Sequence, residues 1–197
     1  MYNTVKTLKI IAQNGKFFRG KIKEDKNGEN FVIQLRDIVK NERGDYLDLK
    51  NLLRTNISTK GHIEYLKAGD VLITVKGAKK YAFHLEKVPS KTVVSQHFLI
   101  LRSPDPKIIL PEFIEYAVNS SRCQNWFARK CPGSYQSTLS RETLERLPLP
   151  VLPPEEQQKI VNLIRETRAE KKLLLDLIDN REQQLKALAN KLINTDY

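Results

Sequence analysis

Apolar residues in the C-terminal part of the chain recur with alternating spacings of four and three. No glycine or proline follows Ile160, so this spacing predicts one long amphipathic helix with a coiled-coil-like apolar stripe. Polar residues fill three positions of the stripe, Thr167, Lys171 and Arg181. The stripe itself consists of Ile160, Ile164, Leu174, Ile178, Leu185, Leu188 and Leu192. Because this segment holds nothing to cover the stripe, we expect a helical partner; the alternative is packing back on residues 1–150.

A proline-rich segment precedes this helix. Pro148, Pro150 and Pro153 disfavour a helix, whereas Pro154 followed by acidic residues suits a first helical turn, where the missing N–H has no partner and the helix dipole favours negative charge. The segment therefore predicts a hinge. We expect a domain at residues 1–150 and a dimerisation or spacer helix at residues 151–197.

The first 150 residues mix strand and helix patterns. Two short strands, Lys16–Lys23 and Asn30–Leu35, are predicted to form a hairpin around Asn27-Gly28, because Asn-Gly suits a turn with positive φ. Val71–Lys76 and Thr92–Leu101 are rich in β-branched residues and predict central strands.

Helical patterns follow. A helix is expected from Pro111, with a break near Ser120, and Ser140 is expected to cap a short helix. The fold class predicted is α+β: a mixed-sheet domain followed by a long C-terminal coiled-coil-like helix.

Charge separates the two parts. The chain has a net charge of +11, and residues 1–150 hold 26 Lys and Arg against 15 Asp and Glu, whereas residues 151–197 hold 8 of each. An excess of cations confined to the domain predicts a polyanionic partner, with nucleic acid the first choice and an acidic membrane surface the second. No apolar run is long enough to cross a bilayer and no signal peptide is recognisable, so we expect a cytoplasmic protein.

Two polar loops are the candidate DNA-contacting sites, because each lies at the end of an apolar element and carries lysine beside an aromatic residue. The first holds Lys76, Lys79, Lys80 and Tyr81, and the second holds Lys130, Ser134, Tyr135 and Gln136. The alternative for each loop is an ordinary solvated turn.

Catalysis by the chain itself is not expected. Carboxylates and lysines lack the clustering of a metal-dependent nuclease, and no phosphate-binding glycine loop or methyltransferase cofactor motif is present. His62, His84 and His97 are far apart and predict no metal site, and Cys123 and Cys131 have neither disulfide-scaffold nor zinc spacing, so free thiols are expected. A basic nucleic-acid-binding scaffold without sequence preference, and less favoured a nuclease, are the alternative functions.

The order of motifs from residue 133 to residue 161 resembles the junction between target recognition domain and conserved helix in specificity subunits of type I restriction-modification systems. The residues that carry it are Gly133-Ser134-Tyr135-Gln136, Leu139-Ser140, Leu144, Leu147-Pro148-Leu149-Pro150, Pro153-Pro154, Glu156-Gln157 and Ile160-Val161. Earlier segments that agree are Val32–Ile38, Gly69–Gly77 and Val93–His97.

This resemblance implies a non-catalytic subunit that reads one part of a split DNA target. It also implies methyltransferase partner subunits that use S-adenosylmethionine, and a restriction subunit that uses ATP and Mg²⁺. Family members typically carry two recognition domains and two helices, whereas one of each is recognisable here. We therefore expect a homodimer through the C-terminal helix and an interrupted palindromic target. Pairing with a different recognition chain, or of the helix with a methyltransferase alone, is the alternative.

Overall fold

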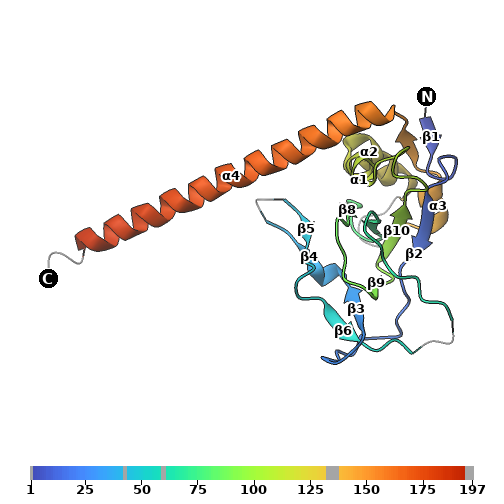
Figure 1. Cartoon of the computed structure of the whole chain (residues 1–197), viewed down its shortest axis with the longest axis horizontal. Coiled ribbons are helices and arrows are strands. Elements are labelled where there is room, and N and C mark those ends of the chain that lie inside the picture. The colour runs from blue at the N-terminus through green and yellow to red at the C-terminus, as the bar shows by residue number, and fades with distance from the viewer. Residues whose placement is uncertain (1, 42–43, 59–60, 132–137, 194–197) are drawn as a thin grey trace.

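The structure is a computed structural model, which describes residues 2–41, 44–58, 61–131 and 138–193. A mixed α+β domain lies at one end, and a single long helix, α4 (Pro154–Ile193), projects from it (Figure 1). The predicted fold class is confirmed. No described helix is both long and apolar enough to cross a membrane.

The centre of the domain is an antiparallel sheet in the order β2-β10-β7-β8. Its strands are β2 (Ile11–Asn14), β7 (Val71–Thr74), β8 (Ala82–His84) and β10 (Phe98–Arg102). Successive residues of β7 point to opposite faces: Ile73 joins the core beneath the helices, and Leu72 joins a second core on the other face. Because both faces of β7 are buried, its sequence is a nearly continuous run of apolar residues.

A second sheet has the order β6-β3-β9 and consists of β3 (Asn30–Ile33), β6 (Leu53–Thr55) and β9 (Thr92–Val94). The β-rich run at Thr92–Leu101 was predicted as one strand, but it is divided at Ser95–His97 and supplies β9 to this sheet and β10 to the first. A 3₁₀ turn, η1 (Leu35–Asp37), follows β3, and a small hairpin pairs β4 (Ile38–Val39) with β5 (Tyr46–Leu47).

The hairpin predicted between Lys16–Lys23 and Asn30–Leu35 is wrong. Both edges of β3 are occupied, by β6 on one side and by β9 on the other, so residues 16–23 run as an irregular segment with one bridge between Lys16 and Ser95. Gly28 has no positive φ. Its role is close packing instead, because a Cβ at this position would lie 2.5 Å from the Thr55 nitrogen.

The predicted break in the first helix is confirmed. Helix α1 (Pro111–Asn119) ends at Ser120, whose hydroxyl accepts a hydrogen bond from the Cys123 nitrogen and starts α2 (Ser121–Lys130). Ser140 likewise caps α3 (Arg141–Glu145) by accepting from the Thr143 nitrogen at 3.1 Å. Cys123 and Cys131 are both free thiols, and burial raises the pKa of Cys123.

The proline-rich segment forms part of a sheet and is therefore not a free hinge. Residues Pro148–Pro150 form β11, which pairs antiparallel with β1 (Tyr2–Thr4) and so ties the segment to the N-terminal part of the domain. Helix α4 begins at Pro154 as predicted. At about 1.5 Å per residue its 40 residues extend about 60 Å.

The first turns of α4 are attached to the domain. Val161 is buried in the core beneath α1, and Ile160 packs against the same core. Arg165 pairs with Glu112 of α1, and one turn later Arg168 pairs with Glu115 at 3.2 Å. These two ion pairs form a clamp between α1 and α4. Beyond the clamp the helix extends away from the domain (Figure 1).

Candidate nucleic-acid interface

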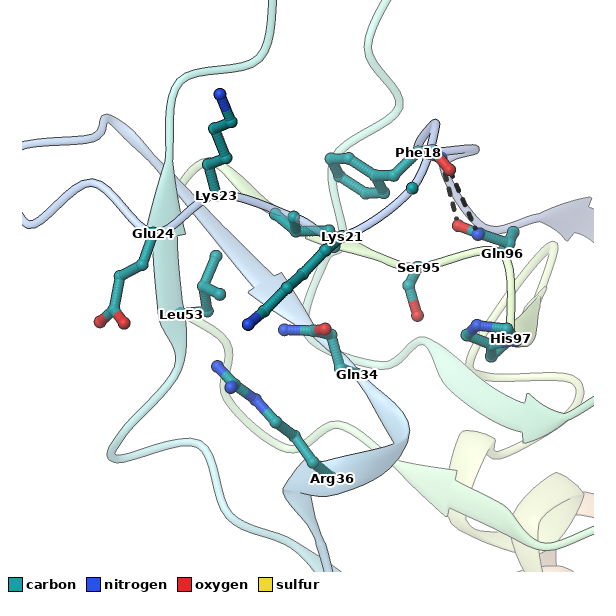
Figure 2. Close-up of a pocket in the computed structure, with 12 residues that line it drawn as sticks. Phe18, Lys21, Lys23, Glu24, Gln34, Arg36, Leu53, Ser95, Gln96 and His97 are labelled. Atoms are coloured by element: carbon teal, nitrogen blue, oxygen red, sulfur yellow. Dashed lines mark hydrogen bonds between the residues drawn. The ribbon is translucent and has the colours of Figure 1, made fainter.

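A groove of about 700 Å³ opens on the domain where the irregular segment 18–24 passes over the second sheet. Its wall on one side is this segment, and the opposite side is formed by residues 34–36 after β3 and by the turn between β9 and β10 (Figure 2). Three distant parts of the chain therefore build one concave surface.

Cations dominate the groove. Lys21 and Lys23 line it from the irregular segment and Arg36 lines it from η1, against a single lining carboxylate, that of Glu24. The Arg36 guanidinium is well exposed, although its Nε lies 3.8 Å from the buried carboxylate of Asp37. Such a surface favours a polyanion.

Hydrogen bonds hold the irregular segment in place above the turn. The Phe18 nitrogen donates to Gln96 Oε1 at 3.2 Å, and Gln96 Nε2 donates in return to the Phe18 carbonyl at 3.5 Å (Figure 2). Gly15 permits the close approach before it, since a Cβ there would lie 2.1 Å from the Ser95 carbonyl oxygen. The groove is thus built by specific contacts.

Two polar atoms within the groove lack a partner among the described residues. They are Ser95 Oγ, on a side chain that is 2% exposed, and Gln34 Nε2. Buried polar atoms are nearly always paired in proteins, so each unpaired one calls for a ligand or a water. Their presence on the floor of a cationic groove makes the groove a candidate recognition site.

The first predicted DNA-contacting loop lies beside this groove. Lys76 and Lys79 are exposed after β7, and the Val75 nitrogen next to them donates to the carbonyl of His97, a groove residue, at 3.0 Å. The nitrogen of Leu139, which follows the second predicted loop, donates to the Val75 carbonyl at 2.9 Å.

Lys80 must be removed from the predicted contacts. Its side chain is 1% exposed, and its Nζ donates to the carbonyls of Val75 and Gly77 at 3.0 and 2.9 Å. Burial lowers the pKa of this ammonium group. Lys80 therefore holds the loop together from inside, where a DNA phosphate cannot reach it.

The other residues that were predicted to contact DNA differ in how exposed they are. Tyr81 is half-buried against Phe83, with the Lys40 ammonium 5.3 Å from its ring centre. Lys130 is exposed at the end of α2. Ser134, Tyr135 and Gln136 lie outside the described residues.

The predicted stripe of α4 divides into two parts. Ile160 is half-buried and packs on its own domain, and Ile164 is half-buried beside the clamp formed by Arg165 and Arg168. The rest of the stripe is more than half exposed, namely Leu174, Ile178, Leu185, Leu188 and Leu192. Folding back on the domain is thus limited to the first turns.

Sequence reasoning missed the groove. Two of its three cations belong to a stretch with a basic residue at every second or third position, Lys16, Arg19, Lys21, Lys23 and Lys26. That pattern was available as a signal, but it was interpreted as a strand. Gln34 and Ser95 lie in segments that support the family resemblance, but nothing in the sequence marked them as site residues, because only the fold brings them to the same groove.

Comparison with known proteins assigns the family. The family model described as type I restriction modification DNA specificity domain matches residues 4–185. No curated protein sequence gives a significant match.

Solved structures share the fold at low sequence identity. The S subunit of a type I restriction-modification system from M. genitalium is 18% identical, with a TM-score of 0.56 over 84% of this chain and 38% of that one. The HsdS subunit from Thermoanaerobacter tengcongensis is 16% identical, with a TM-score of 0.57 over 87% and 39%.

A third similar chain comes from work on complex assembly and conformational transition of the type I R-M system. It is 14% identical, with a TM-score of 0.62 over 95% of this chain and 43% of that one. The chain therefore spans about two fifths of the length of these relatives. Since the family match covers nearly all of the sequence, the chain belongs to the family of type I restriction-modification DNA specificity domains.

Proposed function

We propose that this chain is a specificity subunit that recognises a duplex DNA sequence for a type I restriction-modification system and performs no catalysis itself. The observation that carries the proposal is the cationic groove with unpaired polar atoms on its floor, beside the exposed lysines of the loop after β7, in a chain of this family. This combination suits a partner that offers both phosphates and base edges.

The two kinds of residue have different tasks in this proposal. Exposed lysines such as Lys23, Lys76 and Lys79 neutralise phosphates, release counterions and supply affinity that does not depend on sequence. Polar groups in the groove contact base edges and select the sequence.

The exposed part of α4 is the proposed dimer interface with a second copy of the chain. In an antiparallel pairing, Leu174 of one copy packs against Leu192 of the other, and Ile178 packs against Leu188 of the other. The aliphatic part of the Arg181 side chain then covers Leu185 of the other copy. Each apolar position is then covered from Leu174 to Leu192, and all of these residues lie beyond the clamp that attaches α4 to its own domain. Two domains related by a twofold axis would read an interrupted palindrome.

Methyltransferase subunits carrying S-adenosylmethionine, and a restriction subunit that uses ATP and Mg²⁺, complete the proposed assembly. The same helix would then hold the methyltransferase subunits while the domain positions them on DNA. Pairing with a different recognition chain would replace the palindrome by an asymmetric split target.

The test is selection of bound duplexes from a random pool by the whole chain, alone and together with its methyltransferase subunit. A recurrent motif in two half-sites of inverted sequence supports the proposal. Equal retention of all duplexes supports the scaffold alternative, and cleavage of duplexes by the purified chain with Mg²⁺ supports the nuclease.

A salt titration tests the phosphate contacts separately. Replacing Lys76 and Lys79 with alanine should weaken binding and reduce the slope of log K against log salt by about 0.9 for each lost phosphate contact. The control is Lys186→Ala on the exposed part of α4, which should leave the slope unchanged. An unchanged slope for the double variant would place the DNA elsewhere on the domain.

A further inference from the structure

Three hydrogen-bond donors converge in the groove. The ammonium of Lys21, the amide of Gln34 and the guanidinium of Arg36 point toward one another from two segments of the chain, while the Glu24 carboxylate is turned away from them (Figure 2). Lysine and arginine side chains donate only, and Gln34 Nε2 is a donor with no acceptor among the described residues. The convergence therefore calls for a ligand that offers acceptors.

Among the base pairs, guanine meets this requirement best. Its major-groove edge presents two acceptors, N7 and O6, whereas adenine and cytosine each place an amino donor there and thymine a methyl group. Arginine or lysine on guanine is also the commonest specific contact in protein–DNA complexes.

The position of Gln34 favours a base over a phosphate. Its Nε2 atom is buried in the groove and faces the exposed side chains of Lys21 and Arg36, whereas the Lys23 ammonium points away from them (Figure 2). Phosphates contact the outermost cations, and a base edge is the part of DNA that is read by neutral amides and hydroxyls.

We propose that Lys21, Gln34 and Arg36 form a guanine-reading cluster, so that each half-site of the target contains a guanine whose N7 and O6 atoms lie against these donors. This inference rests on the proposed function, since it needs duplex DNA in the groove. Ser95 supplies a further hydroxyl on the floor, which can donate or accept toward the neighbouring base.

The experiment uses the selected duplex and a copy in which one guanine at a time is replaced by 7-deazaguanine, which lacks the N7 acceptor. Binding of the whole chain is measured by fluorescence anisotropy at fixed salt. At one guanine of each half-site the substitution should weaken binding about tenfold, because one acceptor of the base contact is lost.

Two variants test whether Arg36 and Gln34 contact this guanine. Arg36→Ala and Gln34→Glu, which replaces the amide donor with an acceptor, should lose the preference for guanine at that position, and 7-deazaguanine should then cost them little more. Lys26→Ala is the matched control, because Lys26 is exposed two residues beyond the segment 18–24 and does not line the groove, and it should keep the full preference. Thermal unfolding of each variant verifies that the domain is folded.

The outcomes separate the two proposals. A wild-type chain that selects no motif overturns the proposed function itself. If a motif is selected but both folded variants keep the wild-type base preference, the guanine-reading cluster is overturned alone. Variants that weaken binding to all duplexes equally and reduce the salt slope would show that these donors hold a phosphate, which also overturns it.

Discussion

The side-chain amide of Gln157 joins the first turn of α4 to the backbone that leads into α1. Its Oε1 accepts a hydrogen bond from the Leu110 nitrogen at 2.9 Å, and its Nε2 donates to the carbonyls of Ile108 and Leu152 at 3.0 and 2.8 Å. Gln157 is 2% exposed. This buried amide, together with the ion pairs of Arg165 and Arg168, determines the direction in which the long helix leaves the domain.

Gln157→Ala should destabilise the domain by about 1–3 kcal/mol, because it leaves the partly buried Leu110 nitrogen and two carbonyls without their partner. Urea unfolding followed by circular dichroism measures the loss. Gln158→Ala is the control, since Gln158 is exposed and bonds only to Asn162 one turn along the helix among the described residues. Equal midpoints for the two variants would contradict a structural role for the Gln157 amide.

Arg102→Met should destabilise the domain by about 3–5 kcal/mol, because it leaves the buried Asp70 carboxylate without its cation. Arg102 Nε and Nη2 donate to the two carboxylate oxygens of Asp70 at 2.7 and 2.9 Å, and Asp70 is fully buried. The comparison is Arg141→Met, which removes an exposed pair with Glu145 and should cost less than about 1 kcal/mol. The denaturant midpoints of the two variants measure and compare their losses of stability.

Acid should weaken the wild-type fold partly through Glu64. The hydrogen bond from Arg102 lowers the pKa of Glu64 below its usual value of 4.5, so its charged form is favoured in the folded state. That contribution is complete above the unfolded-state pKa and is lost as the pH falls through the lower folded-state pKa.

Glu64→Gln should therefore flatten the fall of stability as the pH drops below about 5, by less than about 1 kcal/mol because Glu64 is partly exposed. Urea midpoints across this range measure it. Parallel curves for the variant and the wild type would show that Glu64 does not contribute.

Replacing Ile178 and Leu185 with lysine should abolish the proposed dimer, because both side chains lie in the paired stripe and are more than half exposed in the single chain. Light scattering at micromolar concentration should report a dimer for the wild type and a monomer for the variant.

Leu173→Lys is the matched control for the dimer. Leu173 is equally exposed on α4 but lies off the stripe, so this variant should remain dimeric. A wild-type chain that is monomeric would remove the basis for a symmetric target.

Local sequence patterns were sufficient to predict the helical elements. Proline followed by acids at Pro154, the weak helix formers near Ser120 and the cap at Ser140 act through neighbouring residues, so their effect is visible without knowledge of the fold. The stripe of α4 is likewise a matter of spacing within one segment. For the same reason the exposed positions from Leu174 to Leu192 were predicted correctly.

Pairing between strands was not predictable in this way. Residues 16–23 carry an alternating pattern suited to a strand, but β3 pairs with β6 and β9 instead. The run from Thr92 to Leu101 supplies two different sheets. Which edge a strand occupies depends on contacts far away in the chain, and a one-dimensional pattern contains no information about them.

The candidate site was likewise only partly predictable from the sequence. Net charge and the lysines after β7 predicted an anionic partner from composition alone, and the resemblance of motifs predicted the family that the comparisons confirm. The tertiary structure alone buried Lys80 and brought Lys21, Gln34 and Ser95 to one groove. Charge and helical periodicity are properties of neighbouring residues, whereas a groove exists only once distant segments have packed together.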